Sequence, residues 1–317
     1  MWLNILLIIT GLVLLQQGAA FLVKGSSGLA RKFRVSELAI GLTIVAFGTS
    51  APELVVNSFA SFKSNYDIVF GNIIGSNIFN LFIILTIVAI IAPLRVQSST
   101  AWKEIPFSFF AILLLFLLAN DRLVFHRDIS RISRFDGFIM IVAFALFLRY
   151  VFKQLKYDAG INYSEKGTEK TGIILVLIAT GLAGLVLGGK LVLDNAVELA
   201  SGLGMSEKLI GLTIVAAGTS LPELATSVVA AAKKNSDIAV GNIIGSNIFN
   251  ILFILPVSSF IRPLKFDPGF NRDIGFIAGG TFILFIAMYT GKRMQIDRWE
   301  ALILFLTYVA YIFLMIK

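Results

Sequence analysis

The sequence predicts an all-α polytopic membrane protein with ten transmembrane helices, arranged as two inverted five-helix repeats. Hydrophobic residues make up 57% of the 317 residues. The mean hydropathy of +0.88 is that of a membrane protein rather than a soluble globule. Apolar segments of about 20 residues, the length that crosses a bilayer, recur along the whole chain. One long stretch also occurs twice, which indicates a duplicated architecture.

The repeated stretch runs from Gly41 to Asn80 and again from Gly211 to Asn250. Aligned without gaps at an offset of 170, the two copies agree at 27 of 40 positions, and their last ten residues, GNIIGSNIFN, are identical. The same offset aligns Gly18 with Gly188. The repeat therefore extends beyond the two copies to the halves of the chain.

The apolar segments, taken in order, predict five spans in each half. The first segment lacks the positively charged n-region of a signal peptide and is expected to be a span. The ten spans are expected near 2–23, 36–60, 67–92, 104–120, 135–152, 172–193, 206–231, 238–261, 272–290 and 298–316. The expected units are a first five-helix repeat at 1–152 containing copy 41–80, a cytoplasmic linker at 153–171, and a second five-helix repeat at 172–317 containing copy 211–250.

An odd number of spans in each half makes the second half enter the membrane from the opposite side. Such inverted repeats are typical of transporters with a site near the midplane. Loops after odd-numbered spans hold 16 Lys and Arg residues, against 11 on the other side. The positive-inside rule therefore predicts cytoplasmic odd loops and extracellular termini, in a multi-pass protein of the plasma (cell) membrane. Despite the net charge of +8, no basic stripe with interleaved aromatic residues occurs, so no nucleic acid partner is expected.

Each copy carries the pattern G-T-S-x-P-E inside an apolar span, ending in Glu53 in the first copy and Glu223 in the second. A carboxylate near the middle of a span costs about 2.5–3.5 kcal/mol on insertion scales, so its presence indicates a function. Helical spacing places Thr49 and Ser50 on one stripe with Glu53. Pro52 is expected to kink the helix and to free backbone carbonyl groups.

The polar side chains of the two copies all offer oxygen. They comprise two carboxylates, two amides and six hydroxyls, from Glu53, Glu223, Asn80, Asn250, Thr49, Ser50, Ser76, Thr219, Ser220 and Ser246. The chain has no cysteine and one histidine, so copper and zinc lack their usual ligands. Hard cations remain, because calcium accepts six to eight oxygens at about 2.3–2.6 Å. Sodium, which has nearly the same radius, can compete for such a cage.

These motifs resemble those of the sodium/calcium exchanger family of the cation/calcium antiporter superfamily. Its two alpha-repeats carry G-[TS]-S-x-P-[ED] followed by G-N-x-x-G-S-N-x-x-[ND], and both motifs occur here twice and in order. The chain is similar over its whole length to a minimal prokaryotic-type member without a large regulatory loop. The resemblance implies that Glu53 and Glu223 bind calcium, with the backbone carbonyls of Thr49 and Thr219. It also implies flanking sodium sites lined by Thr49, Ser50, Ser76, Thr219, Ser220 and Ser246, with the carbonyls of Ala46 and Ala216.

One position varies within the family. The last residue of the second motif is Asp in potassium-dependent members, but it is Asn250 here. The resemblance therefore implies exchange without potassium and a central site with two formal negative charges. Three sodium ions would exceed that charge by one, so exchange is expected to be electrogenic.

The expected function is secondary-active antiport of sodium and calcium by alternating access. Calcium and sodium are the expected ligands, the bilayer is the expected surrounding, and neither a cofactor nor an obligate protein partner is expected. A calcium/proton antiporter, in which the two carboxylates release calcium on protonation, is the nearest alternative. A cation channel with an oxygen-lined site is another. An enzyme is not expected, because no pair of nucleophile and base appears.

The polar residues also have readings without a functional role. The two glutamates could be neutral acids that form hydrogen bonds between helices. The hydroxyls could only pack helices together, and Asn80 and Asn250 could only brace them. Asn72 and Asn242 are the second residues of the two identical GNIIGSNIFN stretches, and they are expected to stabilise a helix start.

Overall fold

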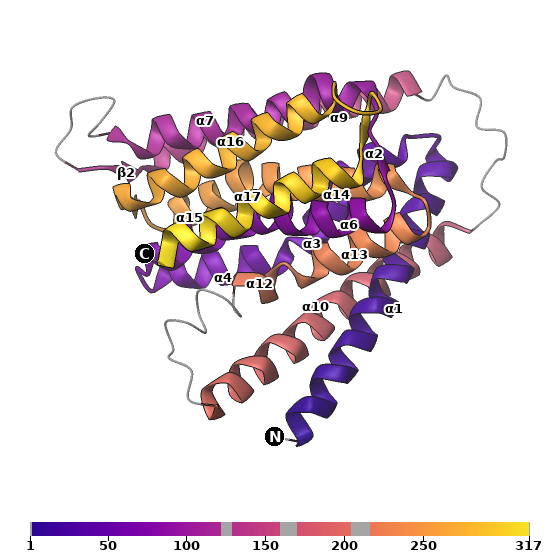
Figure 1. Ribbon diagram of the computed structural model, residues 1–317, viewed down its shortest axis with the longest axis horizontal. Helices are drawn as coiled ribbons and strands as arrows, with labels where there is room; N and C mark the ends of the chain where they lie inside the picture. The colour runs from indigo at the N-terminus through magenta and orange to yellow at the C-terminus, as the bar shows by residue number, and fades with distance from the viewer. Residues whose placement is uncertain (1, 122–128, 159–169, 204–215, 317) are drawn as a thin grey trace.

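The computed structural model describes residues 2–121, 129–158, 170–203 and 216–316, which are almost entirely helical (Figure 1). The α-helices are α1 Trp2–Phe33, α2 Glu37–Ile40, α3 Ala46–Thr49, α4 Ala51–Phe62, α5 Tyr66–Ile78, α6 Leu85–Ile91, α7 Ile105–Ala119, α9 Arg134–Asp158, α10 Thr171–Gly202, α12 Ala216–Thr219, α13 Leu221–Ala232, α14 Ser236–Phe249, α15 Leu255–Ile261, α16 Asn271–Ala287 and α17 Arg298–Ile316. The other helical turns are the π-helical η1 Gly41–Val45, η2 Phe79–Ile84, η3 Thr100–Glu104 and η5 Asn250–Ile254, and the 3-10 turn η6 Pro268–Phe270.

Seven helices of the described chain are long and apolar enough to cross a membrane. They are Trp2–Phe33, Tyr66–Ile91, Thr100–Ala119, Arg134–Lys153, Thr171–Ala200, Ser236–Ile261 and Pro268–Ala287. The bent pair Glu37–Thr49 and Ala51–Phe62 adds an eighth if it is one span. The prediction of a helical, multi-pass membrane protein is therefore confirmed.

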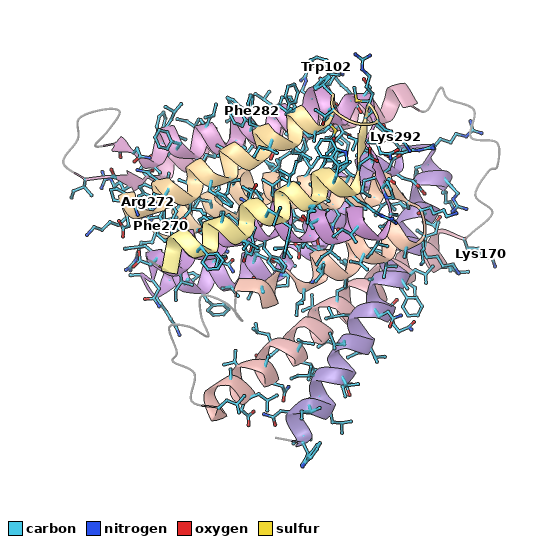
Figure 2. All side chains as sticks on the ribbon, viewed as in Figure 1. Trp102, Lys170, Phe270, Arg272, Phe282 and Lys292 are labelled. Carbon is cyan, nitrogen blue, oxygen red and sulfur yellow. The ribbon has the colours of Figure 1, made fainter. Side chains whose placement is uncertain are left out.

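Large apolar side chains lie exposed on the helices, between charged ends. Figure 2 shows Phe282 on α16, between Arg272 at the start of that helix and Lys292 in the turn beyond its end. Phe282 is 55% exposed, and Trp102 at the start of the α7 span is 57% exposed. Exposed apolar side chains between charged ends are typical of helices that face lipid.

The helices α1 and α10 lie side by side and antiparallel (Figure 1). Glycines form the contact. A Cβ built on Gly18 would lie 2.8 Å from the carbonyl oxygen of Gly181, and one built on Gly11 would lie 2.8 Å from that of Gly188. The two backbones therefore meet directly, which small residues make possible between helices in membranes. Figure 1 shows this pair set at an angle along the lower edge of the other helices.

The helices α5 and α14 carry the two GNIIGSN segments and join the two copies. α14 is buried from Ile238 to Phe249. It contacts η1 and α3 of the first copy and α2 just before that copy, while α5 contacts α12 of the second copy. A Cβ built on Gly241 would lie 2.8 Å from the carbonyl oxygen of Leu38. One built on Gly245 would lie 2.8 Å from the Cβ of Ala46. The two copies therefore interlock and do not form separate bodies.

Four two-residue strands also join the halves, and the all-α prediction did not include them. β1 Leu94–Arg95 pairs antiparallel with β4 Gln295–Ile296, and β2 Arg131–Ile132 pairs antiparallel with β3 Leu264–Lys265. In each pair one strand comes from each half of the chain. Two residues are too few for the period-two pattern by which a strand is recognised in a sequence.

Helix boundaries differ from the expected ones in several places. α1 continues to Phe33 and α10 to Gly202, past the expected ends at 23 and 193. α9 continues to Asp158, so the first six residues of the expected linker 153–171 are helical. Residues 159–169 of that linker, and the first ten residues of the expected span 206–231, lie outside the described residues. The span expected at 36–60 is broken by a bend of 47° between α3 and α4, at the turn before Pro52. The expected kink is therefore confirmed.

Candidate cation site

Glu53 and Glu223 occupy equivalent places, in the first turn of α4 and of α13. A break precedes each helix, at Ser50 (φ −84°, ψ 9°) and at Ser220 (φ −90°, ψ 9°), where the backbone leaves the helical region. The partial positive charge of a helix N-terminus stabilises a nearby carboxylate. Glu53 is 0% exposed and Glu223 is 1% exposed. The two breaks therefore hold both carboxylates inside the protein.

The Glu223 cluster consists of Glu223, Ser50 and Ser246. Ser50 Oγ donates a hydrogen bond to Glu223 Oε1 at 2.7 Å, and Ser246 Oγ lies 3.4 Å from the same oxygen. The two hydroxyl oxygens are 3.1 Å apart. Ser50 comes from the first copy and the other two residues come from the second. Helical spacing would place Ser50 on one stripe with Glu53. The helix is broken at Ser50, however, and its hydroxyl contacts Glu223 of the other copy.

The Glu53 cluster consists of Glu53, Ser76 and Ser220, and it repeats this arrangement with the copies exchanged. Ser220 Oγ, from the second copy, donates to Glu53 Oε1 at 3.3 Å. Ser76 Oγ, from the first copy, donates to the same oxygen at 3.4 Å. Each carboxylate is thus held by one hydroxyl from its own copy and one from the other, so each copy completes the cluster of its counterpart.

Among the buried oxygens that accept no hydrogen bond within the described residues, four belong to the carboxylates and amides predicted to bind ions, and Asn57 Oδ1 beside them is another. The four are Glu53 Oε2, Glu223 Oε2, Asn80 Oδ1 and Asn250 Oδ1. A buried polar atom left unpaired costs about 1–3 kcal/mol, so such a group of oxygens has an affinity for a hard cation or for water. Within the described residues, no group of three or more His, Cys, Asp or Glu side chains is placed to hold a metal ion. A cation in this region would therefore meet two carboxylates and otherwise neutral oxygens.

Thr49 and Thr219 are buried, and each is tied to an asparagine of the other copy. Thr49 Oγ1 donates to Asn242 Oδ1 at 3.0 Å, whereas Thr219 Oγ1 accepts a hydrogen bond from Asn72 Nδ2 at 3.1 Å. The two contacts are equivalent in position but opposite in direction. A cation beside these hydroxyls would therefore meet two chemically different threonines.

The carbonyl group of Ala46 is already engaged. It accepts the backbone N–H of Ser50 at 3.0 Å, and the Thr49 hydroxyl oxygen, whose single proton is also directed at Asn242 Oδ1, lies 3.3 Å away. Ala216, the equivalent residue of the second copy, begins α12. A cation at the Ala46 carbonyl would have to share this oxygen with the backbone N–H of Ser50.

Asparagines also bind the backbone carbonyls of both glutamates; sequence reasoning missed Asn57 and gave Asn72 and Asn242 another role. Asn57 Nδ2 donates to the backbone carbonyl of Glu53 at 2.7 Å and to Asn72 Oδ1 at 2.8 Å. Asn242 Nδ2 donates to the corresponding carbonyl of the second copy at 3.3 Å and to Ser227 Oγ at 3.0 Å. Asn72 and Asn242 were expected to stabilise a helix start, which is wrong, because each lies seven residues past the N-cap of its helix. Their presence in the identical decapeptide was the available signal.

Comparison with known families gives one match that spans both halves. The family model described as "Sodium/calcium exchanger protein" matches residues 3–153 and 173–317. The matched ranges contain every residue of the two carboxylate clusters.

Individual relatives cover nearly the whole chain. The putative antiporter CaxA of Alkalimonas amylolytica is 37% identical over 317 residues, covering 97% of each chain. The sodium/calcium exchanger MaX1 of Methanosarcina acetivorans is 33% identical and covers 98% of this chain and 97% of its own. A solved structure of the sodium-calcium exchanger NCX_Mj superimposes with a TM-score of 0.82 at 31% identity, covering 98% of each chain.

Proposed function

The chain belongs to the sodium/calcium exchanger protein family, a family of transporters and not of enzymes, and we propose that it exchanges sodium for calcium by alternating access. The observation that carries this proposal is the pair of buried carboxylates, Glu53 and Glu223, each held by a hydroxyl from the other copy. Transport requires that an ion be bound where neither side of the membrane has permanent access. A buried site assembled from two interlocked copies meets that requirement.

In this proposal Glu53 and Glu223 bind calcium together with the backbone carbonyls of Thr49 and Thr219. Sodium occupies flanking sites, and Asn80 and Asn250 supply amide oxygens beside the carboxylates. The flanking sites are lined by Thr49, Ser50, Ser76, Thr219, Ser220 and Ser246, with the carbonyls of Ala46 and Ala216. The unpartnered oxygens of the two carboxylates and two amides support this assignment.

The charge of the site determines the electrical character of exchange. Two carboxylates neutralise one calcium ion, and Asn250 adds no third charge. Three sodium ions in place of one calcium would carry one extra positive charge through the membrane. Exchange is then electrogenic, and the membrane potential contributes about 2.3 kcal/mol per 100 mV for each cycle. The neutral Asn250 also leaves potassium without the carboxylate that potassium-dependent members have at this position.

The proposed architecture is ten spans in two inverted repeats, at 1–152 and 172–317, joined by a cytoplasmic linker at 153–171. Contacts that recur with the halves of the chain exchanged support it, at both the carboxylate clusters and the two strand pairs. The excess of Lys and Arg in loops after odd-numbered spans supports a cell membrane orientation with both termini extracellular. The protein acts in this proposal without an obligate protein partner.

Calcium flux into liposomes tests the proposal. Purified full-length protein is reconstituted with sodium inside, and uptake of radioactive calcium is followed after dilution into sodium-free medium. We expect rapid uptake that stops when sodium is equal on both sides, and faster uptake when the interior is made positive. Uptake driven by a proton gradient without sodium would identify a calcium/proton antiporter. Unitary currents in a planar bilayer would identify a channel.

A further inference from the structure

A second pair of amides, from Asn77 and Asn247, is hydrogen-bonded to Asn80 and Asn250. Asn77 precedes Asn80 by one helical turn at the end of α5, and Asn247 precedes Asn250 in the same way at the end of α14. The exposed fractions of the four side chains are 0%, 0%, 5% and 1% for Asn77, Asn80, Asn247 and Asn250. None of the proposed ion contacts uses Asn77 or Asn247.

The four amides form two hydrogen bonds, and both connect one copy with the other. Asn80 Nδ2 donates to Asn247 Oδ1 at 3.1 Å. Asn250 Nδ2 donates to Asn77 Oδ1 at 3.3 Å. In both bonds the nitrogen of the proposed ligand residue is the donor, and an oxygen of the second pair is the acceptor.

These bonds determine which atom of Asn80 and Asn250 is available to a cation. An asparagine amide has one oxygen that accepts and one NH2 group that donates. When the NH2 group is bonded to Asn247 or Asn77, the oxygen points the other way. The oxygens of Asn80 and Asn250 are indeed buried and accept no hydrogen bond within the described residues. If either amide were reversed, its NH2 group would replace that oxygen and would repel a cation.

We propose that Asn77 and Asn247 are positioning residues for the transported cation. Asn247 Oδ1 fixes the amide of Asn80, and Asn77 Oδ1 fixes the amide of Asn250, so that oxygen rather than nitrogen faces the ion. This inference rests on the proposed function. Supporting groups of this kind orient the groups that touch a metal ion and raise its affinity. Each acceptor lies in a different copy from the ligand residue that it holds. The orientation of each ligand oxygen therefore depends on how α5 packs against α14.

Calcium binding to purified full-length protein, measured at equilibrium with radioactive calcium, tests this role in a double-mutant cycle. Asn247→Leu removes the acceptor oxygen, and Asn80→Ala removes the ligand oxygen. We expect each change to raise the Kd for calcium about tenfold or more. The double variant should bind no more weakly than Asn80→Ala alone, because Asn247 acts through Asn80. Asn247→Asp, which keeps an acceptor oxygen at this place, should restore most of the affinity.

The inference would be overturned if the double variant raised the Kd for calcium by the product of the two single effects, or if Asn247→Leu left that Kd unchanged. If Asn247→Leu does not fold, as judged by gel filtration and melting temperature, Asn247→Ala provides the second variant. Asn77→Leu with Asn250→Ala gives the same cycle for the second of the two hydrogen bonds. Wild-type protein and Glu53→Gln separate the proposed function from the positioning role of Asn77 and Asn247. If the wild type binds calcium and Glu53→Gln does not, the site is supported even where the asparagine variants bind normally. If the wild type binds no calcium, the proposed function itself is refuted.

Discussion

Ser50 Oγ lies 2.7 Å from Glu223 Oε1, across 173 residues of sequence, and Ser220 Oγ makes the equivalent contact with Glu53 Oε1 at 3.3 Å. The serine hydroxyl at each helix break therefore donates a hydrogen bond to the carboxylate of the other copy. Neither copy contains a complete cluster alone. Any movement of one copy against the other would change both clusters together, which is the coupling that exchange of two kinds of ion requires.

Neutralising either carboxylate should abolish calcium transport. Glu53→Gln or Glu223→Gln removes one of the two charges and leaves the shape of the side chain unchanged. We expect calcium affinity to fall at least about tenfold, or 1.4 kcal/mol, and sodium-driven calcium uptake to fall to background in liposomes.

Glu104→Gln is the matched control for that experiment. Glu104 is equally buried, but its carboxylate accepts a hydrogen bond from Tyr150 on α9 rather than joining either cluster. Its substitution should alter the melting temperature and leave the Kd for calcium unchanged. Normal calcium uptake in Glu53→Gln or Glu223→Gln would rule out the proposed site.

Potassium should be dispensable for exchange. The amide of Asn250 is neutral, and its nitrogen is bonded to Asn77 Oδ1 at 3.3 Å, so this position carries no charge to bind an additional monovalent ion. Calcium uptake driven by a sodium gradient should proceed at the same rate with potassium absent from both sides of the liposome membrane as with potassium present. A strict requirement for potassium would contradict the role given to Asn250.

Larger residues in the α1 and α10 contact should destabilise the protein. Gly18→Leu places side-chain atoms where a Cβ alone would lie 2.8 Å from the carbonyl oxygen of Gly181, and this backbone cannot move aside without separating the helices. We expect a loss of about 1–3 kcal/mol of stability, measured as a lower melting temperature. Gly172→Ala, on α10 with nothing within 4 Å of the added Cβ, is the control. An equal effect of both changes would exclude close packing as the cause.

The sequence was sufficient for features that depend on local chemistry. Pro52 predicted the helix break, and Glu53 in an apolar span predicted a buried carboxylate, because both follow from the cost of a polar or irregular group in a membrane. Features that depend on tertiary contact were not predictable in the same way. Helical spacing alone gave no reason to expect that Ser50 would bond Glu223 rather than its own copy's carboxylate.

Asn72 illustrates the same limit. A G-N pair ahead of an apolar run is common at a helix start, but here the chain is already helical at that point, and the amide bonds Asn57 and Thr219. Its interior role depends on α12 lying beside α5, which no local pattern encodes. The exact repetition of GNIIGSNIFN was the available signal that these amides have a role beyond local structure.

The threonines should affect sodium more than calcium. Thr49→Ala and Thr219→Ala each remove a side-chain oxygen but keep both carboxylates and the backbone carbonyls proposed for calcium. The sodium concentration for half-maximal exchange should therefore rise, by about two- to tenfold for the loss of one hydrogen-bonding group of roughly 0.5–1.5 kcal/mol. The Kd for calcium should change much less. The Hill coefficient for sodium should also fall, because several sodium ions bind in each cycle.

The opposite hydrogen-bond directions at the two threonines make Ser substitution the matched control. Thr49→Ser keeps the hydroxyl that donates to Asn242 Oδ1, and Thr219→Ser keeps the oxygen that accepts from Asn72 Nδ2. Both should retain sodium dependence near that of the wild type. The alanine variants remove the hydroxyl oxygen and also leave Asn242 Oδ1 or Asn72 Nδ2 without its threonine partner. Sodium-dependent calcium uptake and calcium affinity are measured in all four variants. Equal losses for sodium and calcium in the alanine variants would mean that the two ions share every ligand, and separate flanking sodium sites would have to be abandoned.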